Sequence, residues 1–140
     1  MFSFSEILKD LILENGKSLR NIGLESGIPH SQLSRYIRNT IPKVEVSIKL
    51  AKYFNCTLDY LFGLTDERKR FENKYDFSKF ISRYQKLLEE NNTTHWKFSH
   101  QVNISESSIR QWKKGQIPKM ETIIIIAENL STSIDYLLGK

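Results

Sequence analysis

Residues 19–36 read LRNIGLESGIPHSQLSRY, and residues 95–112 read HWKFSHQVNISESSIRQW. The two stretches lie 76 positions apart, and the same offset aligns residues 4–63 with residues 80–139 without a gap. Other matches at this offset are Ile-Pro-Lys at residues 41–43 and 117–119, and Asp-Tyr-Leu at residues 59–61 and 135–137. An ungapped repeat of this length predicts one small domain used twice.

The composition is ordinary for a soluble globular protein, with 39% hydrophobic and 26% charged residues. No stretch approaches the length of a membrane-spanning helix, and the N-terminus does not resemble a signal peptide, so we expect a cytoplasmic protein. Cys56 is the only cysteine, which excludes an internal disulfide, and its apolar neighbours predict a buried thiol. The net charge of +5 permits nucleic acid as a partner without identifying it.

Apolar residues at helical spacing predict five short helices in each repeat. In the first repeat we expect a helix from Phe4 to Asn15-Gly16, then helices at residues 19–25, 30–38, 44–54 and 58–62. In the second repeat we expect them at residues 78–90, 95–102, 106–114, 120–130 and 134–138. Hydroxyl side chains predict N-caps at Ser18, Thr57, Thr94, Ser105 and Ser133. Ile123 and Ile125 are predicted to be extra apolar surface.

The second and third predicted helices carry a helix-turn-helix pattern in each repeat. Gly23 is small where two helices would cross, and Gly27 follows in the turn. The second repeat has Ser99 and Asn103 at these positions, and Asn is the residue other than Gly that best adopts a left-handed turn. Two matches at one offset are much stronger evidence than one.

The stretch between the repeats, residues 65–76, is highly charged and contains no Gly or Pro. We therefore divide the chain into a domain at residues 1–64, a linker at 65–76 and a domain at 77–140. A solvated helix and an extended tether are both open for the linker, and partial helix is favoured. Phe71 and Tyr75 are spaced i, i+4, so they could anchor one face of it to a neighbouring domain.

Both repeats resemble the Cro/repressor-type (XRE-like) helix-turn-helix family. The residues that carry the likeness are 31–36 with Pro42 and 58–63 in the first repeat, and 107–115 with Pro118 and 134–139 in the second. The resemblance covers nearly the whole chain except the linker. It implies an all-α fold of two tandem five-helix, lambda-repressor-like DNA-binding domains joined by a charged linker.

The phase of the third helix separates an apolar face, with Leu33, Tyr36 and Ile37, from a polar face. From His30 to Lys43 there are three positive charges and no acid, as insertion into the major groove requires. By the resemblance, the base-reading candidates are His30, Ser31, Gln32 and Arg35. The phosphate-binding candidates are Ser18, Arg38, Thr40 and Lys43.

The second repeat predicts a weaker DNA reader, because Glu106 would repel nearby phosphates. Glu106 either accepts a hydrogen bond from cytosine or, more simply, complements a helix N-terminus. The DNA-binding candidates of this repeat are Thr94, Ser107, Ser108, Arg110, Gln111, Lys114, Gln116 and Lys119. Tyr36 and Trp112 lie on the apolar stripes and are predicted to be core residues, not base-stacking ones.

These observations predict a transcriptional regulator of prokaryotic or phage type, with repression as the expected action, that reads a bipartite operator and associates with the nucleoid. The expected partner is double-stranded DNA, bound by an intramolecular pseudo-dimer or a homodimer. The alternative is a protein-interaction regulator, anti-repressor or antitoxin-like, in which one or both domains bind a protein. We expect no catalysis, cofactor, metal, membrane contact or small-molecule ligand; His95 and His100 lack a ligand pattern around them.

Overall fold

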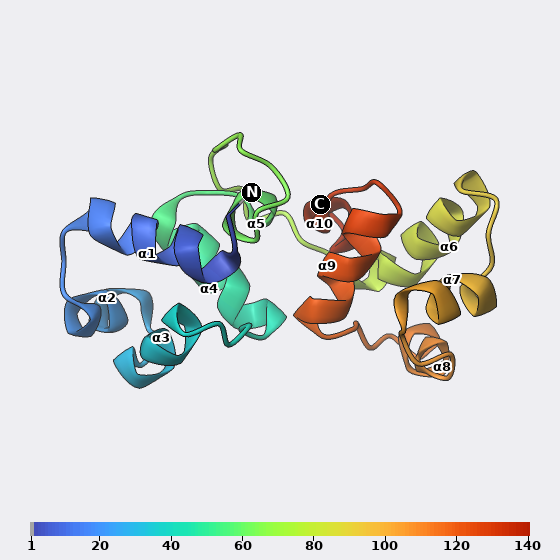
Figure 1. Cartoon of the computed structure of the whole chain (residues 1–140), viewed down its shortest axis with the longest axis horizontal. Coiled ribbons are helices and arrows are strands. Elements are labelled where there is room, and N and C mark those ends of the chain that lie inside the picture. The colour runs from blue at the N-terminus through green and yellow to red at the C-terminus, as the bar shows by residue number, and fades with distance from the viewer. Residues whose placement is uncertain (1) are drawn as a thin grey trace. The chain divides into compact units, whose positions relative to one another are not determined.

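The computed structural model describes residues 2–140 and divides the chain into two compact units between Asn73 and Lys74. Within the described residues every regular element is helical and there is no strand (Figure 1). The prediction of an all-α fold with two five-helix domains is therefore confirmed, while the boundaries at residues 64 and 77 stay a prediction. None of the helices in residues 2–140 is both long and apolar enough to cross a membrane.

Unit 1 packs its helices around a core of buried, mostly aliphatic side chains. Its helices are α1 (Phe4–Asn15), α2 (Leu19–Ser26), α3 (His30–Ile37), α4 (Val44–Phe54) and α5 (Leu58–Leu61). Leu8, Leu33 and Leu50 are fully buried, each contributed by a different helix. Burial of each such side chain stabilises the fold by about 1.5–3 kcal/mol, which is why short helices persist here.

Unit 2 repeats this order, and its core contains a cluster of aromatic rings that contact one another. A short 3-10 helix, η1 (Phe77–Lys79), precedes α6 (Phe80–Glu90), α7 (His95–Val102), α8 (Ser108–Lys113), α9 (Met120–Asn129) and α10 (Ile134–Leu137). The Trp112 ring meets the rings of Phe80 and Tyr84 edge-on, at centroid distances of 5.4 and 5.3 Å. Trp112 is 4% exposed and its counterpart Tyr36 is 7% exposed, so the prediction that both are core residues is confirmed.

Four of the five predicted N-caps are present. The hydroxyls of Ser18, Thr57, Thr94 and Ser133 each accept a hydrogen bond from the backbone N–H three residues later. Such a cap typically stabilises a helix by about 1 kcal/mol. Ser105 is the exception, because its hydroxyl is bonded to the Ser107 hydroxyl instead of to a backbone N–H.

Two predictions about apolar residues have different outcomes. The Cys56 thiol is buried as expected, and burial raises its pKa to about 11. Ile123, however, is fully buried in unit 2, so the prediction that it adds apolar surface is wrong. Its side chain lies on the core face of α9 together with that of Ile126. The run of four isoleucines covers more than one face of the helix, and residues 124 and 125 are only half-buried.

The partial helix favoured for the linker is also a wrong prediction, because residues 65–76 contain no helix. Tertiary contacts determine the backbone here instead of local propensity. Phe71 donates its N–H to the Asn55 side chain in unit 1, at 3.1 Å. Asp76 donates its N–H to the Leu138 carbonyl in unit 2, at 2.9 Å. The linker is therefore extended, with Phe71 bonded to unit 1 and Asp76 bonded to unit 2.

Candidate nucleic-acid interface

The helix crossing of unit 1 depends on Gly23. A Cβ on this residue would lie 2.7 Å from the carbonyl oxygen of Ile28, too close for an ordinary contact. Gly27 follows in the left-handed conformation, with φ of 78°, and its N–H is bonded to the Gly23 carbonyl. Buried Ile22, Ile28 and Leu33 then fix the direction of α3 against α2.

The predicted base-reading residues lie on the first turns of α3. His30, Ser31 and Arg35 are exposed, whereas Gln32 is half-buried. The Gln32 side-chain oxygen accepts a hydrogen bond from the Tyr36 hydroxyl at 3.3 Å, which orients the amide group while its NH₂ remains a donor. This surface presents donors, acceptors and one guanidinium, which is the chemistry needed to read base edges.

The predicted phosphate-binding residues of unit 1 flank α3. The Ser18 hydroxyl caps α2 by accepting from the Asn21 N–H at 3.2 Å, so it shapes the N-terminus of that helix. Arg38 uses its Nε to donate to the Ser34 carbonyl, and its side chain is exposed. Thr40 is half-buried in the following loop, while Lys43 is exposed at the N-cap of α4 and makes no side-chain cap.

At the helix crossing of unit 2, a serine takes the place of the glycine in unit 1. Ser99 stands where unit 1 has Gly23, is 1% exposed, and donates its hydroxyl to the Trp96 carbonyl at 2.9 Å. Asn103 adopts the left-handed conformation with φ of 61°, as predicted for the turn. The same helix-turn-helix therefore tolerates a small side chain at the crossing once its hydroxyl has a partner.

Helix α8, the second helix of the helix-turn-helix in unit 2, begins two residues later than predicted, and Ser105 does not cap it. The Ser105 hydroxyl is bonded to the Ser107 hydroxyl at 2.9 Å. The Glu106 carbonyl is bonded to His95 Nε2 at 2.9 Å. These contacts hold residues 105–107 in a turn, so Glu106 and Ser107 precede α8 and do not form its first turn.

The polar residues predicted to face DNA in unit 2 are nevertheless accessible to solvent. Glu106, Ser107, Arg110, Gln111, Lys114, Gln116 and Lys119 are exposed, and Ser108 is half-buried. Thr94 caps α7 by accepting from the Lys97 N–H at 3.2 Å. Lys119 occupies the N-cap of α9 without a side-chain cap, as Lys43 does at α4. The two units thus offer equivalent positive positions.

Sequence reasoning missed the structural role of His95. Its Nδ1 is bonded to the Tyr84 hydroxyl at 2.7 Å, while its Nε2 is bonded to the Glu106 carbonyl, so one ring connects the buried core to the turn before α8. The positions equivalent to Tyr84 and His95 in unit 1 are Leu8 and Leu19. The sequence signal was this paired replacement of two leucines by two residues that can hydrogen-bond each other.

The comparison with known families agrees with this geometry. The profile of the family described as "Helix-turn-helix" matches residues 8–61 and, a second time, residues 85–137. The chain therefore belongs to the XRE-type helix-turn-helix family, with two tandem copies of the domain, and is a DNA-binding transcription regulator. No curated protein and no solved structure matches the chain.

Proposed function

We propose that the chain is a repressor that reads a bipartite operator, with unit 1 and unit 2 each inserting a recognition helix into the major groove. The observation that supports this most directly is the repeated, exposed basic surface on α3 and α8. Residues 30–43 carry three positive charges and no acid, and residues 106–119 carry four positive charges and one acid. The covalent pair would replace a homodimer, and nonidentical halves suit an operator with nonidentical half-sites.

The salt dependence of DNA affinity tests whether both units bind. If each unit neutralises about three phosphates, the slope of log affinity against log salt concentration is expected to be about −5. A slope of about −2 to −3 would show that one unit alone engages the duplex. Absence of binding to any duplex at low salt would contradict the proposed function altogether.

Arg35 is predicted to read a base. Arg35→Ala is expected to weaken operator binding by about 1–3 kcal/mol and to relax the preference at one base pair, because Arg forms bidentate hydrogen bonds with guanine. The control is Lys9→Ala, which removes one exposed positive charge from α1, outside the helix-turn-helix. If Arg35→Ala has the same operator affinity and base preference as Lys9→Ala, Arg35 does not read a base.

A protein-binding role for unit 2 is the second candidate, and Trp96 favours it. Trp96 is 56% exposed on α7, with its ring 4.5 Å from that of His100. Exposed aromatic residues of this size are enriched at protein interfaces. A salt slope that matches one DNA-bound unit, and that Arg110→Ala leaves unchanged, would favour this alternative for unit 2.

A further inference from the structure

The segment after α5 is docked on unit 1 by several contacts that converge on Arg68. Arg68 Nη1 lies 2.7 Å from Glu14 Oε2, and Nη2 donates to the Phe54 carbonyl at 3.4 Å. The guanidinium also lies over the Tyr60 ring, 5.8 Å from its centroid. An exposed ion pair alone contributes little, but a guanidinium with three partners on α1, α4 and α5 defines one position for the segment.

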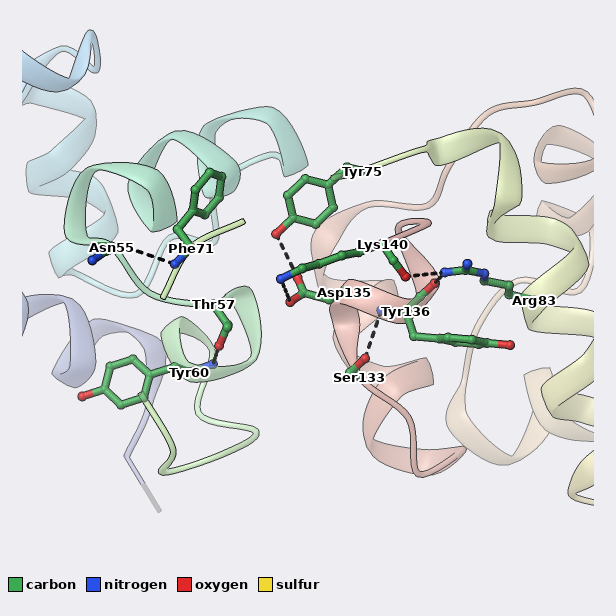
Figure 2. Close-up of polar contacts among 10 residues, drawn as sticks. All are labelled: Asn55, Thr57, Tyr60, Phe71, Tyr75, Arg83, Ser133, Asp135, Tyr136 and Lys140. Carbon is green, nitrogen blue, oxygen red and sulfur yellow. Dashed lines mark hydrogen bonds and ion pairs between the residues drawn. The ribbon is translucent and has the colours of Figure 1, made fainter. Parts of the chain in front are cut away.

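Asn55 completes this first anchor. Its side-chain oxygen accepts the Phe71 N–H at 3.1 Å (Figure 2). Asn55 is the C-cap of α4 and has φ of 52°, so the amide is presented from a backbone conformation that few other residues adopt. Unit 1 therefore holds the chain as far as Phe71.

The second anchor lies on unit 2 and begins at Tyr75. The Tyr75 hydroxyl donates to Asp135 Oδ1 at 2.9 Å, and Lys140 Nζ lies 3.2 Å from Asp135 Oδ2 (Figure 2). The Asp135 and Lys140 side chains are only 13% and 19% exposed, which strengthens their interactions relative to those on the open surface. The bond from the Asp76 N–H to the Leu138 carbonyl extends this anchor by one residue.

Docking at both ends shortens the effective tether. Four backbone steps join Phe71 to Tyr75, so these two residues are at most about 14 Å apart, whatever the arrangement of the units. Residues 65–76, if released from both units and fully extended, would span about 40 Å. The difference of about 26 Å corresponds to roughly 8 base pairs at 3.4 Å per pair. The docked linker therefore allows far fewer half-site separations than its sequence length suggests.

We propose that the docked linker is a short spacer that limits the separation of the two half-sites, and that Arg68, Asn55 and Tyr75 are its specificity-determining residues. They act without contacting DNA, by restricting how far unit 1 and unit 2 can move apart. This inference rests on the proposed bipartite reading of DNA. It adds a determinant of operator choice that lies outside both recognition helices.

The test is selection of bound sequences from a random duplex library, using the full chain. One variant, Arg68→Ala with Asn55→Gly, removes the anchor on unit 1, and Gly suits the positive φ at position 55. A second variant, Tyr75→Phe, removes the hydroxyl that reaches Asp135. The matched control is Lys69→Ala, which loses the same charge one residue away, where Lys69 pairs only with Glu67 of the same segment among the described ion pairs, at 3.7 Å. Thermal unfolding checks that both units remain folded in each variant.

The wild-type chain and Lys69→Ala are expected to select two motifs within a narrow range of separations, about 4 base pairs wide at most, because the docked linker spans at most about 14 Å. The Arg68→Ala/Asn55→Gly variant is expected to select the same two motifs over a range several base pairs wider, with about 10-fold weaker binding at the wild-type separation. Tyr75→Phe is also expected to widen the range of selected separations, but by a smaller amount. Separation profiles identical to wild type in both anchor variants would overturn the spacer proposal while leaving bipartite binding intact. A single motif, or none, selected by the wild-type chain would contradict the proposed function itself.

Discussion

Replacing Trp112 with alanine is expected to destabilise unit 2 by about 3–5 kcal/mol, because it leaves a large cavity in a buried aromatic cluster. Trp112 is 4% exposed, and its ring also lies edge-on to that of His95 at 5.6 Å. A domain of this size has a total stability of roughly 3–10 kcal/mol, so most of unit 2 is expected to lose its fold. Unit 1 lacks this residue and should remain folded.

The measurement is thermal or denaturant unfolding of the full chain, monitored by circular dichroism and by tryptophan fluorescence. Both tryptophans belong to unit 2, so the fluorescence change reports that unit alone. The matched control is Trp96→Ala, which removes the same side chain from a site that is 56% exposed and should cost less than about 1 kcal/mol. Trp112→Tyr introduces the residue found at the equivalent position 36 and should restore part of the lost stability. Equal destabilisation by Trp112→Ala and Trp96→Ala would contradict the core role of Trp112.

The helices were predictable from the sequence wherever apolar spacing and local capping determine them. The helix predicted at residues 44–54 is α4 with the same ends, and Asn55 ends it in a left-handed conformation. The exposed face of α3 was predictable for the same reason, because the phase that buries Leu33 and Tyr36 turns His30 and Arg35 toward solvent. Helical periodicity therefore decides both the core and the candidate reading surface.

Local patterns failed where a distant side chain determines the backbone. The late start of α8 depends on His95, eleven residues earlier in the chain, whose ring holds the Glu106 carbonyl and therefore competes with a helical turn at 105–107. The linker is extended because Arg68 and Phe71 find partners on unit 1. Neither contact has a periodic signature, so local patterns favoured a helix in both places.

Gly139 is expected to be the most sensitive glycine of unit 2. A Cβ at this position would overlap the Asp76 carbonyl group, with the carbonyl carbon at 2.5 Å, and the residue has φ of 89°. Gly139→Ala therefore combines backbone strain of about 1–2 kcal/mol with overpacking of about 1–3 kcal/mol. We expect a loss of roughly 2–5 kcal/mol from the free energy of unfolding of unit 2.

Gly115→Ala is the control that separates strain from steric overlap. Gly115 has a similar φ of 98°, but a Cβ there would meet no atom within 4 Å. Only the backbone strain should remain in that variant. The difference between the two variants' losses of unfolding free energy, measured in denaturant, therefore gives the cost of the steric overlap with Asp76. Because Asp76 belongs to the second linker anchor, Gly139→Ala should also expose Lys74 to trypsin faster than Gly115→Ala does. Equal unfolding free energies together with equal cleavage rates would show that Asp76 is not held against the C-terminal helix, and unit 2 would then have no fixed entry point for the linker.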